Sequence, residues 1–304
     1  MNLIKPKKLQ KGDTIGLLSV SGDIRNVKNI ENAAKYFQSL GYKTVISDTT
    51  YRKFRYHAGS DEERVKNLEE FFQDDKIDAI VCTRGGYGVI RILEKINYDI
   101  IKNHPKILCG YSDITALLLY IYKKTGMVCF HGAMANGDFG GEKISKFTEK
   151  SFFETLSYSK TLSFKANGKV FNKGNASGVL WGGNLATIAS MVGLDFIPDE
   201  KFILFLEDVN EPAYKIDRMF TQLFNVEKIR KNLAGLALGV FSDSEKKNFV
   251  DDTFKEYAKT LQIPCCEGFL ISHEEDKFTL PIGVNCEFSA DKKIIETTER
   301  AFEN

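Results

Sequence analysis

The sequence has almost no net charge and no long apolar run. Its 42 Lys and Arg side chains are offset by 41 Asp and Glu, which leaves a formal charge of +1 over 304 residues. Proteins that bind nucleic-acid backbones carry a basic surface, so this balance argues against a nucleic-acid partner. No stretch approaches the ~18 apolar residues of a membrane helix, and no apolar signal-peptide segment follows the first lysines. We therefore expect a cytoplasmic protein with no membrane partner.

The sequence also lacks the cysteine and histidine patterns of metal sites. Its six cysteines are scattered without a C-x-x-C pair, and none of its four histidines stands at zinc-ligand spacing from another. In a reducing compartment the cysteines are expected to be free thiols. No metal site is predicted.

What the sequence does contain is the pattern of a globular α/β protein. Hydrophobic residues make up 43% and charged residues 27%, and the length suits two domains of ordinary size. Apolar runs at 14–20 and 106–112 alternate with segments of helical spacing at 27–42 and 113–126. Apolar strands between amphipathic helices predict a parallel sheet covered on both faces.

The composition changes between residues 136 and 178, where Gly, Asn, Lys and Ser accumulate. Such a stretch predicts a connection with short irregular strands. We expect an N-terminal α/β domain over 1–150, a linker over 151–175 and a smaller, β-rich mixed α/β domain over 176–304. Within the second domain, a helix is predicted over 181–193.

A glycine-rich motif follows the third predicted strand, at the sheet edge where open α/β proteins bind ligands. In TRGGYG (83–88), Gly85 and Gly86 allow backbone amides to approach a ligand closely. The motif lacks a complete G-x-G-x-x-G pattern and a Walker lysine, so it does not indicate a nucleotide site. A simple turn before a helix explains it equally well.

A serine motif follows the fourth predicted strand. GYSD (110–113) places Ser112 between a strand and a helix, which is the context of a nucleophile elbow. Ile114 stands where the G-x-S-x-G pattern has its second glycine. Taken alone, the motif therefore favours a helix cap over a nucleophile.

A reactive serine needs a base and an acid that orients the base. His131 follows an apolar strand and His273 lies in a turn-rich segment, and the residue pattern does not choose between them. The candidate acid lies at the end of the apolar strand KFILFLED, where Glu207 and Asp208 stand. The order serine, acid, histidine is that of α/β-hydrolases.

Taken together, these motifs resemble the LD-carboxypeptidase family of serine peptidases, which includes the microcin-C immunity peptidases. The likeness runs along nearly the whole chain in five ordered blocks, at 83–88, 110–132, 179–193, 203–223 and 272–283. It implies an N-terminal α/β domain joined to a smaller C-terminal domain, with the active site at their junction, and a homodimer.

The resemblance implies a catalytic triad. The family's GYSD serine falls on Ser112, the glutamate of its FLED-x-NE motif on Glu207, and the histidine before its DK-x-TLP-x-G motif on His273. The family's oxyanion hole falls on the backbone N–H groups of Gly86 and Asp113. Ser-His, His-Gly-Ala and SVSG replace the family's usual sequences at three loops, which affects loop shape and leaves the triad complete.

The resemblance also implies a reaction. A cytoplasmic muropeptide would lose its terminal D-Ala at an L,D bond, in peptidoglycan recycling, through an acyl-enzyme and without a metal or organic cofactor. One alternative is a related peptidase that cleaves aminoacyl-nucleotides, and another is a non-catalytic α/β protein that binds a small ligand. Predicted substrate contacts are Arg84, whose guanidinium fork matches a carboxylate, and Gly85, Trp181, Asn184, Asn210 and Glu211.

Overall fold

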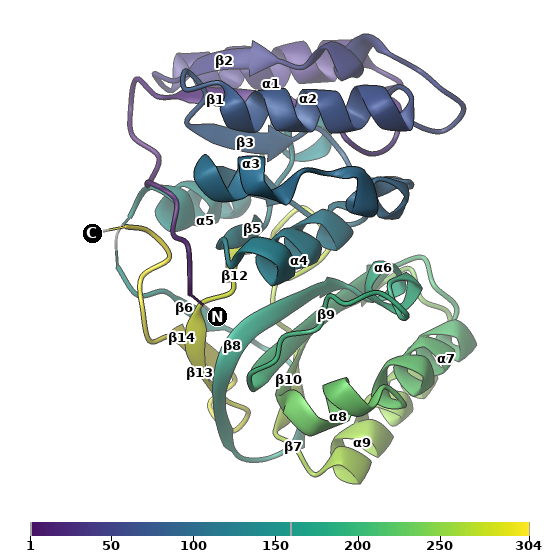
Figure 1. Ribbon diagram of the computed structural model, residues 1–304. Coiled ribbons are helices and arrows are strands. Elements are labelled where there is room, and N and C mark those ends of the chain that lie inside the picture. The colour runs from purple at the N-terminus through teal and green to yellow at the C-terminus, as the bar shows by residue number, and fades with distance from the viewer. Residues whose placement is uncertain (1, 159, 304) are drawn as a thin grey trace.

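The computed structural model describes residues 2–158 and 160–303, and its N-terminal half is built on a six-stranded sheet (Figure 1). The strand order is β12-β5-β4-β3-β1-β2. All neighbouring strands are parallel except β12, which pairs antiparallel with β5. The strands are β1 (Thr14–Leu18), β2 (Lys43–Ile46), β3 (Ala79–Cys82), β4 (Ile107–Gly110), β5 (Cys129–His131) and β12 (Leu280–Ile282).

Helices cover both faces of this sheet, as predicted. Figure 1 shows α2, α3 and α4 in front of it and α5 behind, and α1 shares the face of α5 through the rings of Phe37 and Phe152. The Ser60 and Glu63 capping box forms at the start of α2, and Gly126 ends α4 at a φ of +78°. The helices are α1 (Val27–Ser39), α2 (Asp61–Gln73), α3 (Tyr98–Asn103), α4 (Ile114–Thr125) and α5 (Lys146–Ser157).

The C-terminal half is built on an eight-stranded mixed sheet in the order β6-β14-β13-β8-β9-β10-β11-β7. Its strands are β6 (Ser163–Lys165), β7 (Val170–Asn172), β8 (Asn175–Asn184), β9 (Phe202–Val209), β10 (Leu233–Ser242), β11 (Cys265–Glu267), β13 (Asn285–Ser289) and β14 (Ile294–Thr297). Its helices are α6 (Leu185–Ser190), α7 (Ala213–Phe224), α8 (Glu227–Asn232) and α9 (Lys247–Leu261). The two α/β halves of the prediction are therefore present.

The two halves share elements. The expected linker, 151–175, holds the end of α5 together with β6 and β7, both of which pair within the C-terminal sheet. In return, β12 from the C-terminal half forms an edge of the N-terminal sheet. The segment before β12 is thereby brought to the edge at which β4 and β5 end.

The helix predicted over 181–193 is confirmed only for its middle part, Leu185–Ser190. Residues 181–184 continue β8, which pairs in parallel with β9, and α6 starts only at Leu185. The strand end packs closely on α4, because a β-carbon on Gly183 would lie 2.5 Å from Cγ2 of Thr115. This contact places the end of β8 against the first turn of the helix that follows Ser112.

Candidate active site

Ser112 lies on a tight turn between β4 and α4. Its φ is +62°, a left-handed conformation that is uncommon for a residue with a β-carbon. The backbone thus has the strained strand–turn–helix geometry that exposes a nucleophile. Ile114 stands where the usual motif has its second glycine, and it fits because Gly110 has no β-carbon. A β-carbon on Gly110 would lie 2.8 Å from Cγ2 of Ile114.

Glu207 and His273 are in contact. Oε2 of Glu207, at the end of β9, lies 2.8 Å from Nδ1 of His273, in the loop before β12. Glu207 is fully buried, whereas the His273 side chain keeps 20% of its exposure. Burial lowers the pKa of His273, but the hydrogen bond and the charge of Glu207 outweigh burial, and the net pKa is raised above its usual value.

One cavity joins the serine and the histidine. It has a volume of about 180 Å³ and is lined by Thr83, Arg84, Gly85, Gly86, Tyr111, Ser112, Met134, Asn136, Gly137 and His273. The serine comes from the N-terminal sheet and the histidine from the C-terminal segment that crosses to it. The cavity therefore lies where the two halves meet, as the resemblance implies.

The glycine motif passes directly over Ser112. A β-carbon on Gly85 would lie 2.9 Å from Oγ of Ser112 and 3.3 Å from the backbone N of Asp113. Gly22 holds this loop by donating its N–H to the Gly85 carbonyl at 3.2 Å. The backbone amides of the glycine loop and of Asp113 are thus brought to the same side of the serine, where the predicted oxyanion hole would lie.

The side chain of Asp113 fixes the turn. Its buried Oδ2 accepts hydrogen bonds from Oγ of Ser21 at 2.5 Å and from the backbone N of Val89 at 3.0 Å. Both donors belong to loops that follow other strands of the sheet. The aspartate of GYSD therefore positions its own backbone around Ser112.

A buried cluster supports the histidine, and the sequence did not reveal it. Tyr111 packs its ring edge-on against His273 at a centroid distance of 5.0 Å, and Nζ of Lys277 lies 5.0 Å from the Tyr111 centroid. Lys277 is 3% exposed and forms an ion pair with Asp138. Asp276 and Lys277 are the first two residues of the DK-x-TLP-x-G motif. In the sequence this motif indicated the position of the histidine but not the role of Lys277.

His131 is placed differently from His273. It is 2% exposed, and its Nδ1 has no hydrogen-bond partner among the described residues. Burial is the main reason that its pKa falls to about 4, which leaves the imidazole neutral at pH 7. His131 is not among the residues that line the cavity, so its geometry does not suit a base for Ser112.

The predicted substrate contacts divide into two groups. Arg84 and Gly85 line the cavity. Trp181 is fully buried between the rings of Phe196 and Phe202, so the prediction that it contacts substrate is not supported. Asn184 caps α6 through Thr187 and is 5% exposed, which gives it a structural role.

The remaining two predicted contacts follow β9. Asn210 is exposed at a φ of +60°, and Glu211 pairs with Lys215 at 3.4 Å. Neither lines the cavity at Ser112. Asp208 accepts hydrogen bonds from the side chain of Asn184 and from the backbone N of Ala186.

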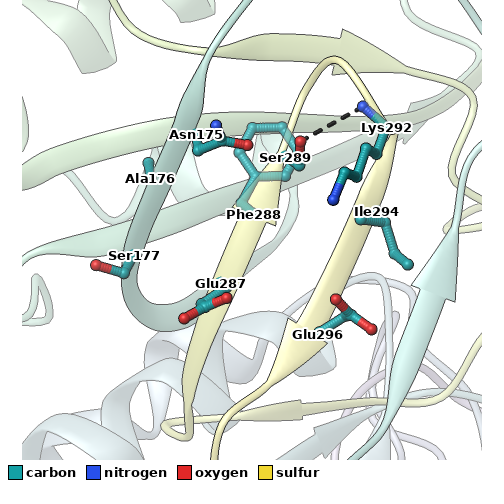
Figure 2. Close-up of a pocket in the computed structure, with 9 residues that line it drawn as sticks. All are labelled: Asn175, Ala176, Ser177, Glu287, Phe288, Ser289, Lys292, Ile294 and Glu296. Carbon is teal, nitrogen blue, oxygen red and sulfur yellow. Dashed lines mark hydrogen bonds between the residues drawn. The ribbon is translucent and has the colours of Figure 1, made fainter.

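A second hollow, of about 370 Å³, lies on the C-terminal sheet over β8, β13 and β14 (Figure 2). The labelled side chains include Asn175, Ser177, Glu287 and Glu296, and those described as lining it contain no histidine or cysteine. Ser177 and Ser289 line this hollow, but no histidine does, so it offers no serine–histidine pair. The chemistry of the molecule therefore points to Ser112.

Two protein-family models match the chain, one in each half of the molecule. The LD-carboxypeptidase N-terminal domain matches residues 15–132, and the LD-carboxypeptidase C-terminal domain matches residues 177–288. The chain belongs to the LD-carboxypeptidase family. The family consists of serine peptidases, so this LD-carboxypeptidase family member is a hydrolase.

Relatives of this family member carry two kinds of name. The "Probable murein peptide carboxypeptidase" of Bacillus subtilis (strain 168) is 33% identical over 298 residues, covering 95% of this chain and 92% of that protein. The "Microcin C7 self-immunity protein MccF" of Escherichia coli is 30% identical over 327 residues, covering 96% and 95%.

Solved structures give the same two groups. MccF in complex with aspartyl sulfamoyl adenosine superposes with a TM-score of 0.88 at 26% identity, over 99% of this chain and 100% of that chain. The muramoyltetrapeptide carboxypeptidase from Oxalobacter formigenes superposes with a TM-score of 0.83 at 27% identity, over 93% and 97%.

Within the described ranges, no helix has the length and apolarity needed to cross a bilayer. In the same ranges, no group of three or more His, Cys, Asp or Glu side chains is arranged to hold a metal ion. The six cysteines are free and buried.

Proposed function

We propose that this protein is a serine carboxypeptidase that hydrolyses the L,D bond of a murein tetrapeptide and releases its terminal D-alanine. The observation that carries the proposal is the single cavity that Ser112 and the Glu207-paired His273 both line. The names of the Bacillus and Oxalobacter relatives support the substrate class.

The first step forms an acyl-enzyme. Nδ1 of His273 donates a hydrogen bond to Oε2 of Glu207, which leaves Nε2 free to accept the proton of Ser112 as Oγ attacks the scissile carbonyl. Glu207 holds this tautomer and stabilises the imidazolium. The proton then passes from His273 to the departing amine, and D-alanine leaves.

The second step regenerates the serine. His273 removes a proton from water, the resulting hydroxide attacks the acyl-enzyme, and the proton returns to Oγ of Ser112. In both steps the N–H groups of Gly86 and Asp113 stabilise the oxyanion, each contributing about 3 kcal/mol. No step in this scheme calls for a metal or an organic cofactor.

Arg84 is our proposed contact for the substrate's terminal carboxylate. It lines the cavity and is fixed there because Nη1 donates to the Asp23 carbonyl at 2.9 Å. A guanidinium fork has further N–H groups available to bind the planar carboxylate. A carboxypeptidase needs such a cation beside its nucleophile, because its substrate ends in a free carboxylate.

The dimensions of the cavity favour D-alanine over a nucleotide as the leaving group. Its volume of about 180 Å³ is below the roughly 300–1,000 Å³ of pockets that enclose drug-sized ligands. Trp181 is buried and has no face to offer a base. These two features support the murein peptide over the aminoacyl-nucleotide, although MccF is also a relative.

We place this activity in the cytoplasm, in the recycling of cell-wall peptides, and we propose a homodimer as the working assembly. Both follow from the family likeness. Sedimentation of the purified protein tests the assembly, and fractionation of cells that produce it tests the location.

The deciding experiment offers three substrates to the purified protein: an L,D-tetrapeptide, a D,D-pentapeptide and an aspartyl sulfamoyl adenosine. Mass spectrometry scores the products. We expect D-alanine from the tetrapeptide alone. Cleavage of the nucleotide derivative alone would instead favour an immunity peptidase, and binding without hydrolysis of any of the three would favour a ligand-binding protein.

A further inference from the structure

A short hairpin presents aromatic and basic side chains beside the cavity. Residues 51–57 read YRKFRYH, and 51–56 are all exposed. Phe54 and His57 exchange backbone hydrogen bonds of 2.9 and 3.0 Å, so Arg55 and Tyr56 form the tip of a two-residue hairpin. Arg55 has a φ of +59°, a strained conformation that the surrounding bonds must hold.

One segment ties this hairpin to the wall of the cavity. The backbone N of Asp23 donates to the Tyr56 carbonyl at 3.1 Å, and the N of Gly22 donates to the Gly85 carbonyl at 3.2 Å. Gly85 covers Ser112. A single chain segment therefore separates the hairpin from the glycine loop over the nucleophile.

A second link joins the hairpin to the glycine motif itself. Nδ1 of His57 lies 2.9 Å from the carbonyl oxygen of Tyr87, and the centroids of the His57 and Tyr87 rings are 5.4 Å apart. Tyr87 directly follows Gly86, which lines the cavity. The hairpin tip and Tyr87 thus lie on either side of a buried histidine.

Three large aromatic side chains are exposed on this surface. Tyr56 is 73% exposed, Tyr87 54% and Phe54 45%, and the guanidinium of Arg55 lies 5.2 Å from the Phe54 ring centroid. One exposed aromatic residue is ordinary, but a group of Tyr, Phe and Arg has the composition of a binding surface.

The charge of the surface is positive. Residues 52–56 contain three cations and no carboxylate. The carboxylate of Asp23 is bound by Lys53 at 2.7 Å. The hydrogen bond from Lys53 holds the pKa of Asp23 below its usual value, and the charges of Arg84 and Arg25 lower it further. A ligand that suits this surface carries negative charge.

We propose that Phe54, Arg55, Tyr56 and Tyr87 form a second binding subsite, which holds an acidic arm of the peptide substrate. Arg55 binds a side-chain carboxylate of that arm, and the aromatic rings pack on its apolar groups. The inference rests on the proposed function. Because binding energy from a remote part of a substrate can be used in the transition state, the subsite would raise kcat/KM.

The test compares two tetrapeptides that differ only in whether the internal glutamyl carboxylate is free or amidated. Arg55→Asn removes the cation with a residue that tolerates the left-handed backbone. We expect this variant to lose about tenfold in kcat/KM for D-alanine release from the acidic peptide, and less than twofold for the amide. Tyr56→Ser is expected to weaken the turnover of both peptides, because it removes apolar contact.

The chain offers a matched control at the start of α9, which Lys246 directly precedes. Lys246 also has a positive φ, of +56°, and lies over the exposed ring of Phe249 at 5.3 Å. Figure 1 shows α9 at the far end of the C-terminal half from β1 and β3. Lys246→Asn and Phe249→Ser should leave both peptides within twofold of the wild type.

Equal losses with both peptides in Arg55→Asn, or no loss with either, would overturn the subsite while leaving the proposed activity intact. If the wild type releases D-alanine from neither peptide, the proposed function fails. Calorimetric titration of Ser112→Ala then tests the subsite alone. The subsite is supported if Ser112→Ala binds the acidic peptide more tightly than the amide and if adding Arg55→Asn abolishes this preference. Equal binding of both peptides by Ser112→Ala would reject the subsite.

Discussion

The carboxylate of Glu207 is completely buried and meets Nδ1 of His273 at 2.8 Å, although 66 residues separate them in the chain. Its second oxygen, Oε1, has no hydrogen-bond partner among the described residues. The histidine is therefore the main polar contact of a buried acid. Removing the charge of Glu207 is therefore expected to alter the protonation of His273.

This pair predicts the acid limb of the pH profile. A general base must be neutral, and the pKa of His273 is raised above 6.5. We expect kcat/KM to rise with pH through a midpoint above 6.5. Glu207→Gln removes the charge that raises this pKa, so its midpoint should move to lower pH while kcat/KM falls by about 10²–10⁴-fold. Profiles between pH 5 and 9 check both, and an unmoved midpoint would contradict the coupling.

The same pair predicts how stability depends on pH. A histidine whose pKa is higher in the folded state stabilises the fold fully below its unfolded pKa, near 6.5, and loses that contribution as pH rises through the folded pKa. Wild type should therefore lose more free energy of unfolding between pH 6 and 8 than His273→Gln does. Urea unfolding at both pH values measures the difference, and parallel curves would show that the pair makes no such contribution.

The strained nucleophile predicts a separation of stability from activity. Ser112 has a φ of +62°, so Ser112→Ala keeps the strain and Ser112→Gly relieves it. We expect both variants to lose at least ~10³-fold of kcat, because members of a triad act as a unit. The glycine variant should be more stable than the alanine variant by about 1 kcal/mol. Equal urea midpoints would argue against strain, and undiminished D-alanine release would exclude Ser112 as the nucleophile.

The glycine loop predicts a steric block. A β-carbon on Gly85 would lie 2.7 Å from Cβ of Ser112 and 2.9 Å from its Oγ, so Gly85→Ala must displace either the loop or the nucleophile. We expect a loss of about 10²-fold in kcat, the effect of removing one oxyanion donor. An unchanged thermal midpoint would localise the damage to the site, and unchanged kcat would show that this loop does not serve the oxyanion.

Much of this architecture is predictable from the sequence, because apolar runs and helical spacing are local signals. The strands β1 to β4 and the helices α1, α2 and α4 were expected on that basis, whereas α3, between β3 and β4, was not. The strand at 181–184 was not expected, because Trp181, Gly182 and Gly183 directly precede residues with helical spacing and were assigned to the same helix. Only pairing with β9 and contact with Thr115 make it a strand.

The site was less accessible to such reasoning. Periodicity could not choose His273 over His131, since the choice depends on how β12 crosses to β5 and brings the loop before it to Ser112. The family likeness made that choice. It did not reveal Tyr111 and Lys277, whose roles arise from buried contacts between segments far apart in the chain.

Those contacts carry the last prediction. Lys277 is 3% exposed and pairs with Asp138 under the ring of Tyr111, which packs on His273. Lys277→Met leaves Asp138 buried without its partner, so we expect a loss of about 3–5 kcal/mol in the free energy of unfolding. Adding Asp138→Asn removes the stranded charge and should recover much of that loss. Urea unfolding of the two single variants and the double variant measures the coupling between Lys277 and Asp138, and additive losses would show that the two side chains do not stabilise each other.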